Sequence, residues 1–224
     1  MNIDIVVPVL NEAAGWPTVQ RRLAALAACE GVQVWVVDGG STDGTAAMAT
    51  QGGLTVVPSP AGRARQMNAG AAAGQGSVLL FLHADTALPP DWLHSLQAGL
   101  AGGACWGRFD VHIEGQSALL RVVAAMMNGR SRLSGIATGD QAIFMTRAAF
   151  DAVQGFPNQP LMEDIEISKH LLKLSRPVCL RQRVTTSGRR WDTRGVWRTI
   201  FLMWRLRFAY WRGRSPAELA RAYQ

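Results

Sequence analysis

The chain is poor in cysteine. Its 224 residues include three cysteines, Cys29, Cys105 and Cys179, which lie far apart and form no Cys-x-x-Cys pair. Their spacing fits neither a disulfide framework nor a set of metal ligands. Isolated thiols of this kind are typical of a reducing compartment, so we expect a cytoplasmic protein.

Long apolar runs and a leader-like start are also missing. No stretch approaches the roughly 18 apolar residues that a bilayer crossing needs, and the start Met1-Asn2-Ile3-Asp4 has no basic segment. The first predicted strand is followed by Asn11-Glu12, and no Gly-x-Gly-x-x-Gly turn is present. This absence disfavours a dinucleotide-dependent dehydrogenase.

Acidic residues are scarce toward the C-terminus. From Arg176 onward there are twelve arginines and two acids, Asp192 and Glu218, whereas residues 1–175 hold 11 basic and 14 acidic side chains. The net charge of +7 therefore belongs to a nearly neutral body with a basic end. Such an end can meet anionic lipid, nucleic acid or a phosphorylated substrate.

Apolar periodicity predicts alternating strands and helices over the first hundred residues. Four short apolar runs have the near-continuous hydrophobic character of strands buried on both faces. The predicted strands are Ile3–Val9, Val32–Val37, Leu54–Val57 and Val78–Leu82, and the predicted helices are Trp16–Cys29, Thr45–Gln51, Arg63–Ala73 and Asp91–Leu100. This order indicates an α/β protein with helices on both faces of a parallel sheet.

After residue 100 the elements become longer and more varied. Strands are predicted at Cys105–Ile113, Ala142–Thr146 and Val178–Thr186, and helices at Ala118–Met127 and Asp164–Leu174. We expect this second half to extend the same sheet and to form the other side of a cleft. The predicted organisation is one domain over residues 1–191, with halves 1–100 and 101–191, followed by a basic helical tail over 192–224.

A carboxylate follows the second predicted strand. Val36-Val37-Asp38 leads into a glycine turn and then into Ser41-Thr42. Ligands bind at the carboxyl ends of parallel strands, where an acceptor can read a polar edge such as the imide N–H of a uracil. Ser41 and Thr42 alternatively serve as helix caps. Asp38 stands before the turn, and a cap does not explain it.

Polar residues also follow the first and fourth predicted strands. The first strand ends in Pro8-Val9-Leu10-Asn11-Glu12 and the fourth in His83-Ala84-Asp85. Alternate residues face the same way, so His83 and Asp85 can share a divalent cation with a ligand's diphosphate. The alternatives are an Asx turn at Asn11, a capping Asp85 and a His83 at the edge of the core.

Two arginines open the third predicted helix. Arg63 and Arg65 stand in its first turn, where the helix dipole favours acidic groups. A bound phosphate compensates for this arrangement, since helix N-termini and guanidinium groups both suit phosphate oxygens. The alternative is two solvated surface arginines.

Three polar segments stand out in the second half. Glu163 and Asp164 stand at the start of a predicted helix. They either interact favourably with the helix dipole, as acids in a first turn commonly do, or supply a general base. Asp140-Gln141 precedes a short strand and lines the predicted cleft. Arg190-Trp191 combines a cation with an aromatic ring that can stack on a sugar, the alternative being an exposed cation–π pair.

Together these segments resemble the family-two glycosyltransferases, which have the GT-A fold. The matching segments are PVLNE at 8–12, VVDGGSTDGT at 36–45, GRARQMNAG at 62–70, FLHAD at 81–85, GDQAIF at 139–144, MED at 162–164 and SGRRW at 187–191. They follow the family's order and spacing from residue 3 to residue 191. Their wording is most similar to a subgroup of small bacterial members found with radical-SAM and selenium-linked gene clusters.

The resemblance implies a GT-A, Rossmann-like mixed sheet and an inverting transfer from a nucleoside-diphosphate sugar, UDP-linked by the family's habit, to an acceptor hydroxyl. Mg²⁺ or Mn²⁺ then steadies the departing diphosphate. The resemblance implies that the donor is bound by Pro8, Asn11, Glu12, Asp38, Arg63, Arg65, His83 and Asp85, and that Asp85 also binds the metal. It implies that Asp164, with Glu163 beside it, is the base. The implied acceptor-side residues are Asp140, Gln141, Arg190 and Trp191. The acceptor is a small or lipid-linked molecule.

Two departures from the family pattern matter. Members often carry Asp-x-Asp where this chain has His83-Ala84-Asp85, and one carboxylate fewer weakens the case for tight metal binding. The last motif begins with Ser187, whereas processive synthases often have glutamine there. Because no membrane span is predicted either, a polymer-extruding synthase is disfavoured.

The basic tail carries an aromatic stripe. Five aromatic residues fall at i, i+4, i+7, i+11 and i+14, on one side of a helix, with arginines beside them. They are Trp197, Phe201, Trp204, Phe208 and Trp211, flanked by Arg198, Arg205 and Arg212, with Arg207 and Arg214 further round. We expect this helix to dock on the domain with its aromatics in the core. The alternatives are peripheral contact with the inner face of the membrane and the seam of a homodimer.

Two other classes of function compete. A basic nucleic-acid-binding protein predicts steeply salt-dependent retention on DNA or RNA, but it does not explain acids placed at strand and helix ends, so no nucleic-acid partner is expected. A non-catalytic sensor of nucleotide sugars fits the weakened metal motif. Such a sensor binds the donor without transferring its sugar.

Overall fold

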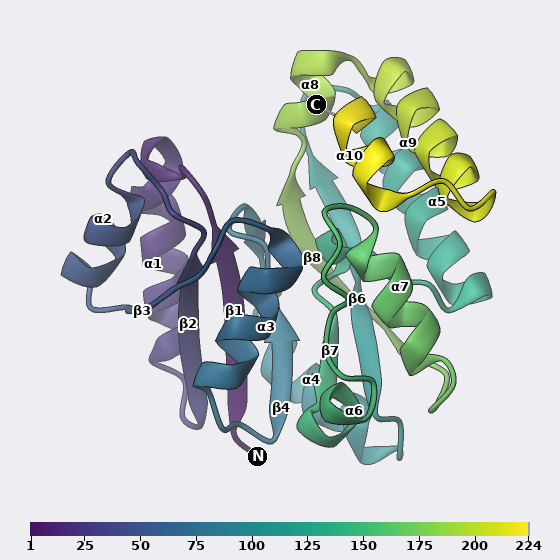
Figure 1. The fold of residues 1–224 in the computed structure, drawn as a ribbon. Coiled ribbons are helices and arrows are strands. Elements are labelled where there is room, and N and C mark those ends of the chain that lie inside the picture. The colour runs from purple at the N-terminus through teal and green to yellow at the C-terminus, as the bar shows by residue number, and fades with distance from the viewer. Residues whose placement is uncertain (224) are drawn as a thin grey trace.

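The computed structural model describes residues 1–223 as a mixed α/β fold (Figure 1). Eight strands form one sheet in the order β3-β2-β1-β4-β7-β6-β8-β5. In the first half, β1 (Ile3–Val9) pairs in parallel with β2 (Val32–Asp38) and β4 (Val78–Phe81), and β2 pairs in parallel with β3 (Thr55–Pro58). The predicted parallel sheet is therefore confirmed, with bounds that differ by a residue or two.

Helices cover both faces of this sheet. Alternate residues of each strand therefore belong to two different hydrophobic clusters, one on each face. Val7 and Val36 belong to one buried cluster and Val6 and Val37 to another. The first cluster packs against α1 (Trp16–Ala27), α2 (Thr45–Gln51) and α4 (Trp92–Ala101), and the second against α3 (Arg63–Ala73). Both faces of β1 and β2 are thus apolar, which explains their near-continuous hydrophobic sequences.

The second half extends the same sheet, as expected. β7 (Phe144–Thr146) runs antiparallel to both β4 and β6 (Trp106–Glu114), and so joins the two halves. β8 (Val178–Ser187) lies parallel to β6 and carries the short edge strand β5 (Thr86–Ala87). The remaining elements of this half are α5 (Leu119–Ser134), the 3-10 turn η2 (Gly139–Gln141) and α7 (Glu163–Leu171).

Several short elements were not predicted. They are the 3-10 turn η1 (Ala13–Gly15), β5, α6 (Arg147–Ala152), α8 (Arg189–Arg194) and α10 (Pro216–Tyr223), and α5 extends seven residues beyond the predicted end at Met127. Short elements such as these carry few turns or alternations, and here no strong apolar run marked them. The polar continuation of α5 carries buried Ser131, which accepts a hydrogen bond from the buried Arg108.

The aromatic stripe of the tail corrects a prediction. Its helix, α9 (Val196–Trp211), does dock on the domain, but through the opposite side, with Thr199 and Leu206 buried. The five aromatic side chains point outward and remain 56% to 77% exposed. The prediction that the five aromatic residues share one face of a helix is confirmed. The prediction that this face lies in the core is wrong, because the opposite face of α9, with Leu206, is the one that packs on the domain.

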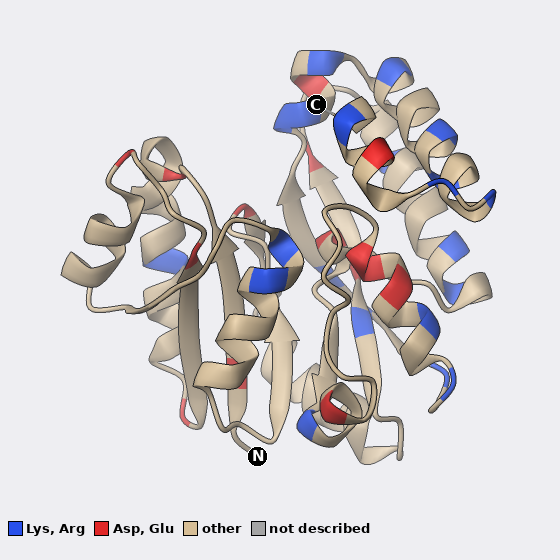
Figure 2. Cartoon of the chain, viewed as in Figure 1, with Lys and Arg blue, Asp and Glu red and all other residues tan. Residues whose placement is uncertain are grey.

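Positive charge is concentrated where the sequence predicted it. Figure 2 shows arginines over α8, α9 and α10, whereas acids and bases are mixed elsewhere. The three cysteines are unpaired thiols. Within residues 1–223 no helix combines the length and apolarity that a membrane crossing requires.

Two helical glycines test how tightly α3 packs on the sheet. A Cβ on Gly70 would lie 2.4 Å from Cγ1 of Val6 and 2.8 Å from Cγ2 of Val37, whereas a Cβ on Gly129 in α5 meets no atom within 4 Å. We expect Gly70→Ala to lower the free energy of unfolding by about 1–3 kcal/mol through overpacking. Gly129→Ala should raise it by about 0.5–1 kcal/mol through helix propensity. Urea unfolding measures both, and a shift of the same sign in the two variants contradicts this packing.

Candidate functional site

The loops that follow β1 and β2 are tied together at the carboxyl edge of the sheet. The Asn11 N–H donates to Oγ of Ser41, and the Thr42 N–H donates to Oδ1 of Asn11, both at 2.9 Å. The Glu12 N–H donates to Oγ1 of Thr45, also at 2.9 Å. Asn11 adopts a left-handed φ of 55° to make this turn. Asn11, Ser41 and Thr42 therefore hold the two loops in register.

Asp38 presents a free acceptor beside these loops. Its Oδ2 accepts the N–H groups of Gly40 and Ser41 at 3.0 Å each, whereas its Oδ1 is buried and has no hydrogen-bond partner within the described chain. Gln66 of α3 fixes the surrounding backbone by donating to the carbonyls of Val9 and Val37. A buried acceptor without a donor is expensive, so a ligand N–H at this point would complete the site.

The two arginines of α3 have different partners. Arg63 is half-exposed, and its Nη1 lies 3.5 Å from Oε1 of the buried Glu163. Arg65 is exposed and donates from Nε to Oδ1 of Asn158 at 3.0 Å. A carboxylate from α7 thus offsets part of the positive charge at the start of α3, where phosphate alone was expected to do so.

His83 and Asp85 have different partners after β4. Nδ1 of His83 lies 3.3 Å from Oδ1 of Asp140, and its buried Nε2 packs against Gly139, where an added Cβ would stand 2.5 Å away. Asp85 accepts from Oγ1 of Thr86 at 3.3 Å. A cation shared by His83 and Asp85 therefore stays a prediction.

Asp85 fits a metal carried by the ligand. Within residues 1–223 no three His, Cys, Asp or Glu side chains are grouped to hold a metal ion. Mg²⁺ sites commonly use one or two carboxylates together with substrate phosphates. Burial, and after it the negative charges of Asp85 and Asp43, raise the pKa of Glu12 despite the opposing charge of Arg189. Glu12, Asp43 and Asp85 thus lie near one another, with Arg189 as the largest opposing charge.

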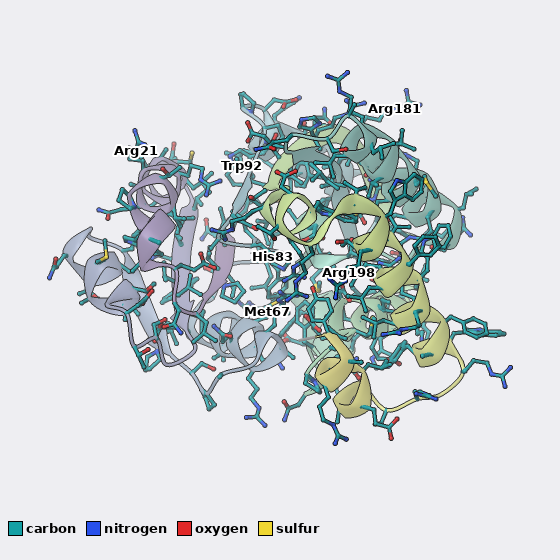
Figure 3. All side chains as sticks on the ribbon, turned by 90° about the horizontal axis from the view of Figure 1, so that it is seen from above. Arg21, Met67, His83, Trp92, Arg181 and Arg198 are labelled. Atoms are coloured by element: carbon teal, nitrogen blue, oxygen red, sulfur yellow. The ribbon has the colours of Figure 1, made fainter. Side chains whose placement is uncertain are left out.

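Charge interactions link this edge to the second half of the molecule. Burial, followed by the charge of Arg63, lowers the pKa of Arg190, and the carboxylates of Asp140 and Asp85 oppose that shift. Arg190 therefore lies near groups from α3, η2 and the end of β4. Seen from above, the labelled His83 lies where the two halves meet (Figure 3). Arg63 and His83 of the first half meet Gly139, Glu163 and Asp164 of the second half around one pocket.

The N-terminus of α7 carries the acidic pair. Met162 holds a left-handed φ of 66° ahead of the helix, Glu163 is 3% exposed, and the two oxygens of Asp164 accept the N–H groups of Gly139 and Ile165. Burial, and next the adjacent charge of Glu163, raise the pKa of Asp164 to about 6. Asp164 is thus a carboxylate that can take up a proton near neutral pH.

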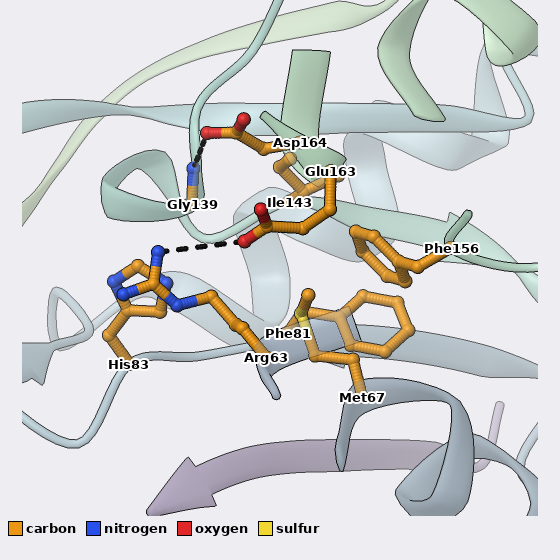
Figure 4. Close-up of a pocket in the computed structure, with 9 residues that line it drawn as sticks. All are labelled: Arg63, Met67, Phe81, His83, Gly139, Ile143, Phe156, Glu163 and Asp164. Atoms are coloured by element: carbon orange, nitrogen blue, oxygen red, sulfur yellow. Dashed lines mark hydrogen bonds and ion pairs between the residues drawn. The ribbon is translucent and has the colours of Figure 1, made fainter. Parts of the chain in front are cut away.

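A small pocket lies between the two halves (Figure 4). Apolar side chains form its floor, and charged groups stand around its rim. The floor is lined by Met67, Phe81, Ile143 and Phe156, and the rim by Arg63, His83, Gly139, Glu163 and Asp164. Its volume of about 10 Å³ has room for about one water molecule, so the pocket marks where charged groups of the two halves meet and does not by itself have the size of a small-molecule site.

The four predicted acceptor-side residues have different surroundings. Asp140 is half-exposed; its burial raises its pKa, but the hydrogen bond and charge of His83 outweigh this, and the pKa is lowered. Arg190 lies at the cleft, over the ring of Tyr223. Gln141, by contrast, is fully buried and bonds to Thr138 and Asn128. Trp191 packs against the core. The last two therefore support the fold around the cleft.

Arg130 of α5 was not among the predicted site residues. Its Nε and Nη2 are buried and lack hydrogen-bond partners within residues 1–223. Burial lowers its pKa, Asp164 opposes this shift, and the neighbouring Arg108 adds to it. Arg130 thus brings a buried cation near Asp164. It lies in the polar continuation of α5 beyond Met127, where no sequence signal marks it.

The sequence profile of Glycosyl transferase family 2 matches residues 4–146, which is more than half of the chain. No curated protein matches the sequence. The matched segment contains the ends of β1, β2 and β4 and the start of α3, but it stops before α7.

Solved structures are similar in fold. Mannosyltransferase PcManGT from Pyrobaculum calidifontis, solved with GDP-Man and Mn²⁺, has a TM-score of 0.69 at 18% identity, over 99% of this chain and 68% of its own. Glucosyl-3-phosphoglycerate synthase from Mycobacterium tuberculosis, solved with Mn²⁺, UDP and glucosyl-3-phosphoglycerate, gives 0.61 at 20%, over 83% and 70%.

S. aureus TarS, solved as a fragment with UDP-GlcNAc, gives a TM-score of 0.64 at 15% identity, over 84% of this chain. The chain spans 58% of the length of that fragment. At these identities the similarity concerns the fold, and the expected GT-A architecture is confirmed.

The acidic pair at α7 makes a titration testable. We expect Asp164 to titrate with a midpoint of about 6, and Glu163→Gln to lower that midpoint because a like charge is removed. Carboxyl ¹³C NMR of the two proteins measures the change, with the distant Glu30→Gln as a control that leaves the midpoint in place. A midpoint near that of a free aspartate in the unmodified protein contradicts this assignment.

Proposed function

The chain belongs to glycosyl transferase family 2, and we propose that it transfers a hexose from a nucleoside-diphosphate sugar, UDP-linked, to an acceptor hydroxyl with inversion. Two carboxylates support the proposal: Asp38, whose buried Oδ1 has no hydrogen-bond partner within the described residues, and Asp164, whose pKa is raised to about 6 beside a pocket between the two halves. The first suits recognition of a base, and the second suits removal of a proton. Membership of the small bacterial subgroup found with radical-SAM and selenium-linked gene clusters is supported only by the residues that occupy the motif positions.

In this proposal the donor lies along the carboxyl edge of the first half. The Asp38 carboxylate accepts the imide N–H of the base, which satisfies its free oxygen. Pro8, Asn11 and Glu12 surround the nucleoside. Arg63 and Arg65, exposed at the start of α3, lie beside the diphosphate, where a helix N-terminus adds N–H groups and a favourable dipole.

Asp85 would hold Mg²⁺ or Mn²⁺ together with the diphosphate oxygens. When bound, the ion neutralises negative charge that develops on the departing nucleoside diphosphate. The complexes of two similar structures contain Mn²⁺, in one with GDP-Man and in the other with UDP. Arg190, which lies near Asp85, adds positive charge from the chain itself.

The proposed base is Asp164. Above its pKa of about 6 it is ionised, so it accepts the proton of the acceptor hydroxyl as that oxygen bonds to the anomeric carbon. The bond from that carbon to the diphosphate oxygen breaks in the same step, and the attack from the opposite side inverts the centre. Glu163 lies against Arg63, and it acts on the reaction by keeping the pKa of Asp164 high.

We also propose that α9 contacts a membrane surface. Its five outward aromatic side chains and the arginines beside them have the composition of an interfacial helix. Such contact would bring the acceptor side, with Asp140 and Arg190, to the inner face of the membrane.

Nucleotide binding is tested by thermal unfolding. We expect UDP with Mn²⁺ to raise the melting temperature, because a ligand that binds only the folded state stabilises it. Asp38→Asn should weaken UDP binding about tenfold or more, since its amide brings N–H groups toward the N–H of the base. The matched control is Glu30→Gln. No shift with UDP, GDP, TDP or CDP, with and without Mn²⁺, counts against the proposal.

The base is tested by Asp164→Asn. Loss of a general base lowers transfer by about 10²–10⁴-fold, while the UDP-induced thermal shift should persist because the nucleotide lies at the other side of the cleft. In the unmodified protein, activity should fall as the pH drops through about 6 and Asp164 becomes protonated. Product formation by mass spectrometry provides the rate. Full activity in the variant removes Asp164 from this role.

A further inference from the structure

Exposed apolar side chains are concentrated on two helices. Nine of the twelve large exposed apolar residues within residues 1–223 lie on α5 or α9. They are Leu119, Val122, Met126 and Leu133 of α5, and Trp197, Phe201, Trp204, Phe208 and Trp211 of α9. Single apolar residues on a surface need no explanation, but a concentration of this kind marks an interaction site.

The four residues of α5 form a row that faces away from the core. They fall at i, i+3, i+7 and i+14, which is one side of a helix. The opposite side of α5 is already used, because Leu120, Val123 and Ala124 are buried in the main hydrophobic cluster. The outward row is therefore a second apolar face, whose side chains are 37% to 82% exposed.

The helices α5 and α9 both pack on the same core cluster. Val196 and Ile200 of α9 pack against the cluster that contains Leu120 and Val123 of α5. In Figure 1, α5 runs behind α9 and α10 in the same part of the molecule. We call the nine exposed residues of these helices the α5–α9 platform.

Positive charge lies beside the aromatic row of α9. Neither helix contains an acidic residue, and the arginines are Arg198, Arg205 and Arg207 on α9 and Arg121 on α5. The other two arginines of α5 are engaged elsewhere, because Arg132 pairs with Asp110 and the guanidinium of Arg130 is buried. Beside the aromatic row, a groove of about 630 Å³ between α8, α9 and α10 is lined by Arg194, Arg198 and Arg205. Phe201 and Tyr223 line the same groove.

We infer that the α5–α9 platform docks on a bilayer that contains anionic lipid, with both helices in contact with the headgroup layer. Aromatic and aliphatic side chains enter the interface, and arginines reach the lipid phosphates. This inference rests on the membrane contact proposed for α9 and extends it to α5. Two helices fix the orientation of the protein on the surface, which one helix cannot do.

In that orientation α9 lies between the membrane surface and the helix that carries the base. Tyr210 of α9 donates from its hydroxyl to Oε2 of Glu166 at 2.6 Å, and Met162 packs in a cluster with Leu206 of α9. Both partners lie within two residues of Asp164. The platform is therefore joined directly to the helix that carries the base, and an amphiphilic acceptor held in the lipid layer fits this arrangement.

A second copy of the chain is a poorer occupant. A two-fold interface places the same surface on both sides. Such an interface would bring the arginines of α5 and α9 close to the same arginines of the second copy, and neither helix contains an acid that could pair with them. Anionic lipid removes this repulsion, whereas self-association creates it.

Co-sedimentation of the full chain with vesicles tests the platform. We expect binding to vesicles of phosphatidylcholine and phosphatidylglycerol at low salt, weaker binding to phosphatidylcholine alone, and weaker binding at high salt. Val122→Asp with Met126→Asp on α5, and separately Trp204→Asp with Phe208→Asp on α9, should each reduce the bound fraction about tenfold or more. Leu10→Asp, an exposed apolar site in the other half, is the matched control.

The platform variants should keep the wild-type thermal response to UDP, which verifies that they are folded. If the α9 variant loses vesicle binding and the α5 variant does not, the two-helix platform is wrong although the proposed α9 contact stands. If neither loses it, both are wrong. A stable dimer by light scattering that the same substitutions dissociate overturns the lipid assignment in favour of a second copy. None of these results bears on nucleotide binding, which is measured without lipid.

Discussion

The buried carboxylate of Glu163 is the group on which the site depends. It lies 3.5 Å from the guanidinium of Arg63, which joins the start of α7 to the start of α3 across the cleft. Its charge also helps to raise the pKa of the adjacent Asp164 to about 6. One residue therefore links the two halves across the cleft and, after burial, contributes most to the raised pKa of the proposed base. A buried carboxylate is tolerated only when paired, and that requirement holds the arrangement together.

The fold could be predicted wherever the period was long or the burial two-sided. The helices Thr45–Gln51 and Arg63–Ala73 and the strand Ile3–Val9 have the predicted bounds. The short elements β5 and α6 could not be predicted, because their conformation is set by neighbours that are distant in sequence. The stripe of α9 shows the same limit. Its period is helical whether it faces a core or the outside, and only the packing of Thr199 and Leu206 decides which.

The candidate site was predicted in position but less well in detail. Because parallel strands end at one edge, Asp38 and Asp85 could be brought together from the sequence alone. The partner of His83 could not, since Asp140 reaches it through the turn after α5. Likewise, nothing in the sequence distinguishes the buried Gln141 from its exposed neighbour. The raised pKa of Asp164 depends on burial in the folded cleft, so the motif identified the residue but not its chemistry.

The central claim is that one cleft holds a nucleotide sugar between Asp38 and Asp164. The most direct measurement is a crystal structure of the protein with a non-transferable UDP-sugar analogue and Mn²⁺. The account predicts the base N–H on Oδ1 of Asp38, the diphosphate and metal beside Asp85, and the anomeric carbon facing Asp164. A nucleotide bound elsewhere, or one whose sugar points away from Asp164, would contradict it.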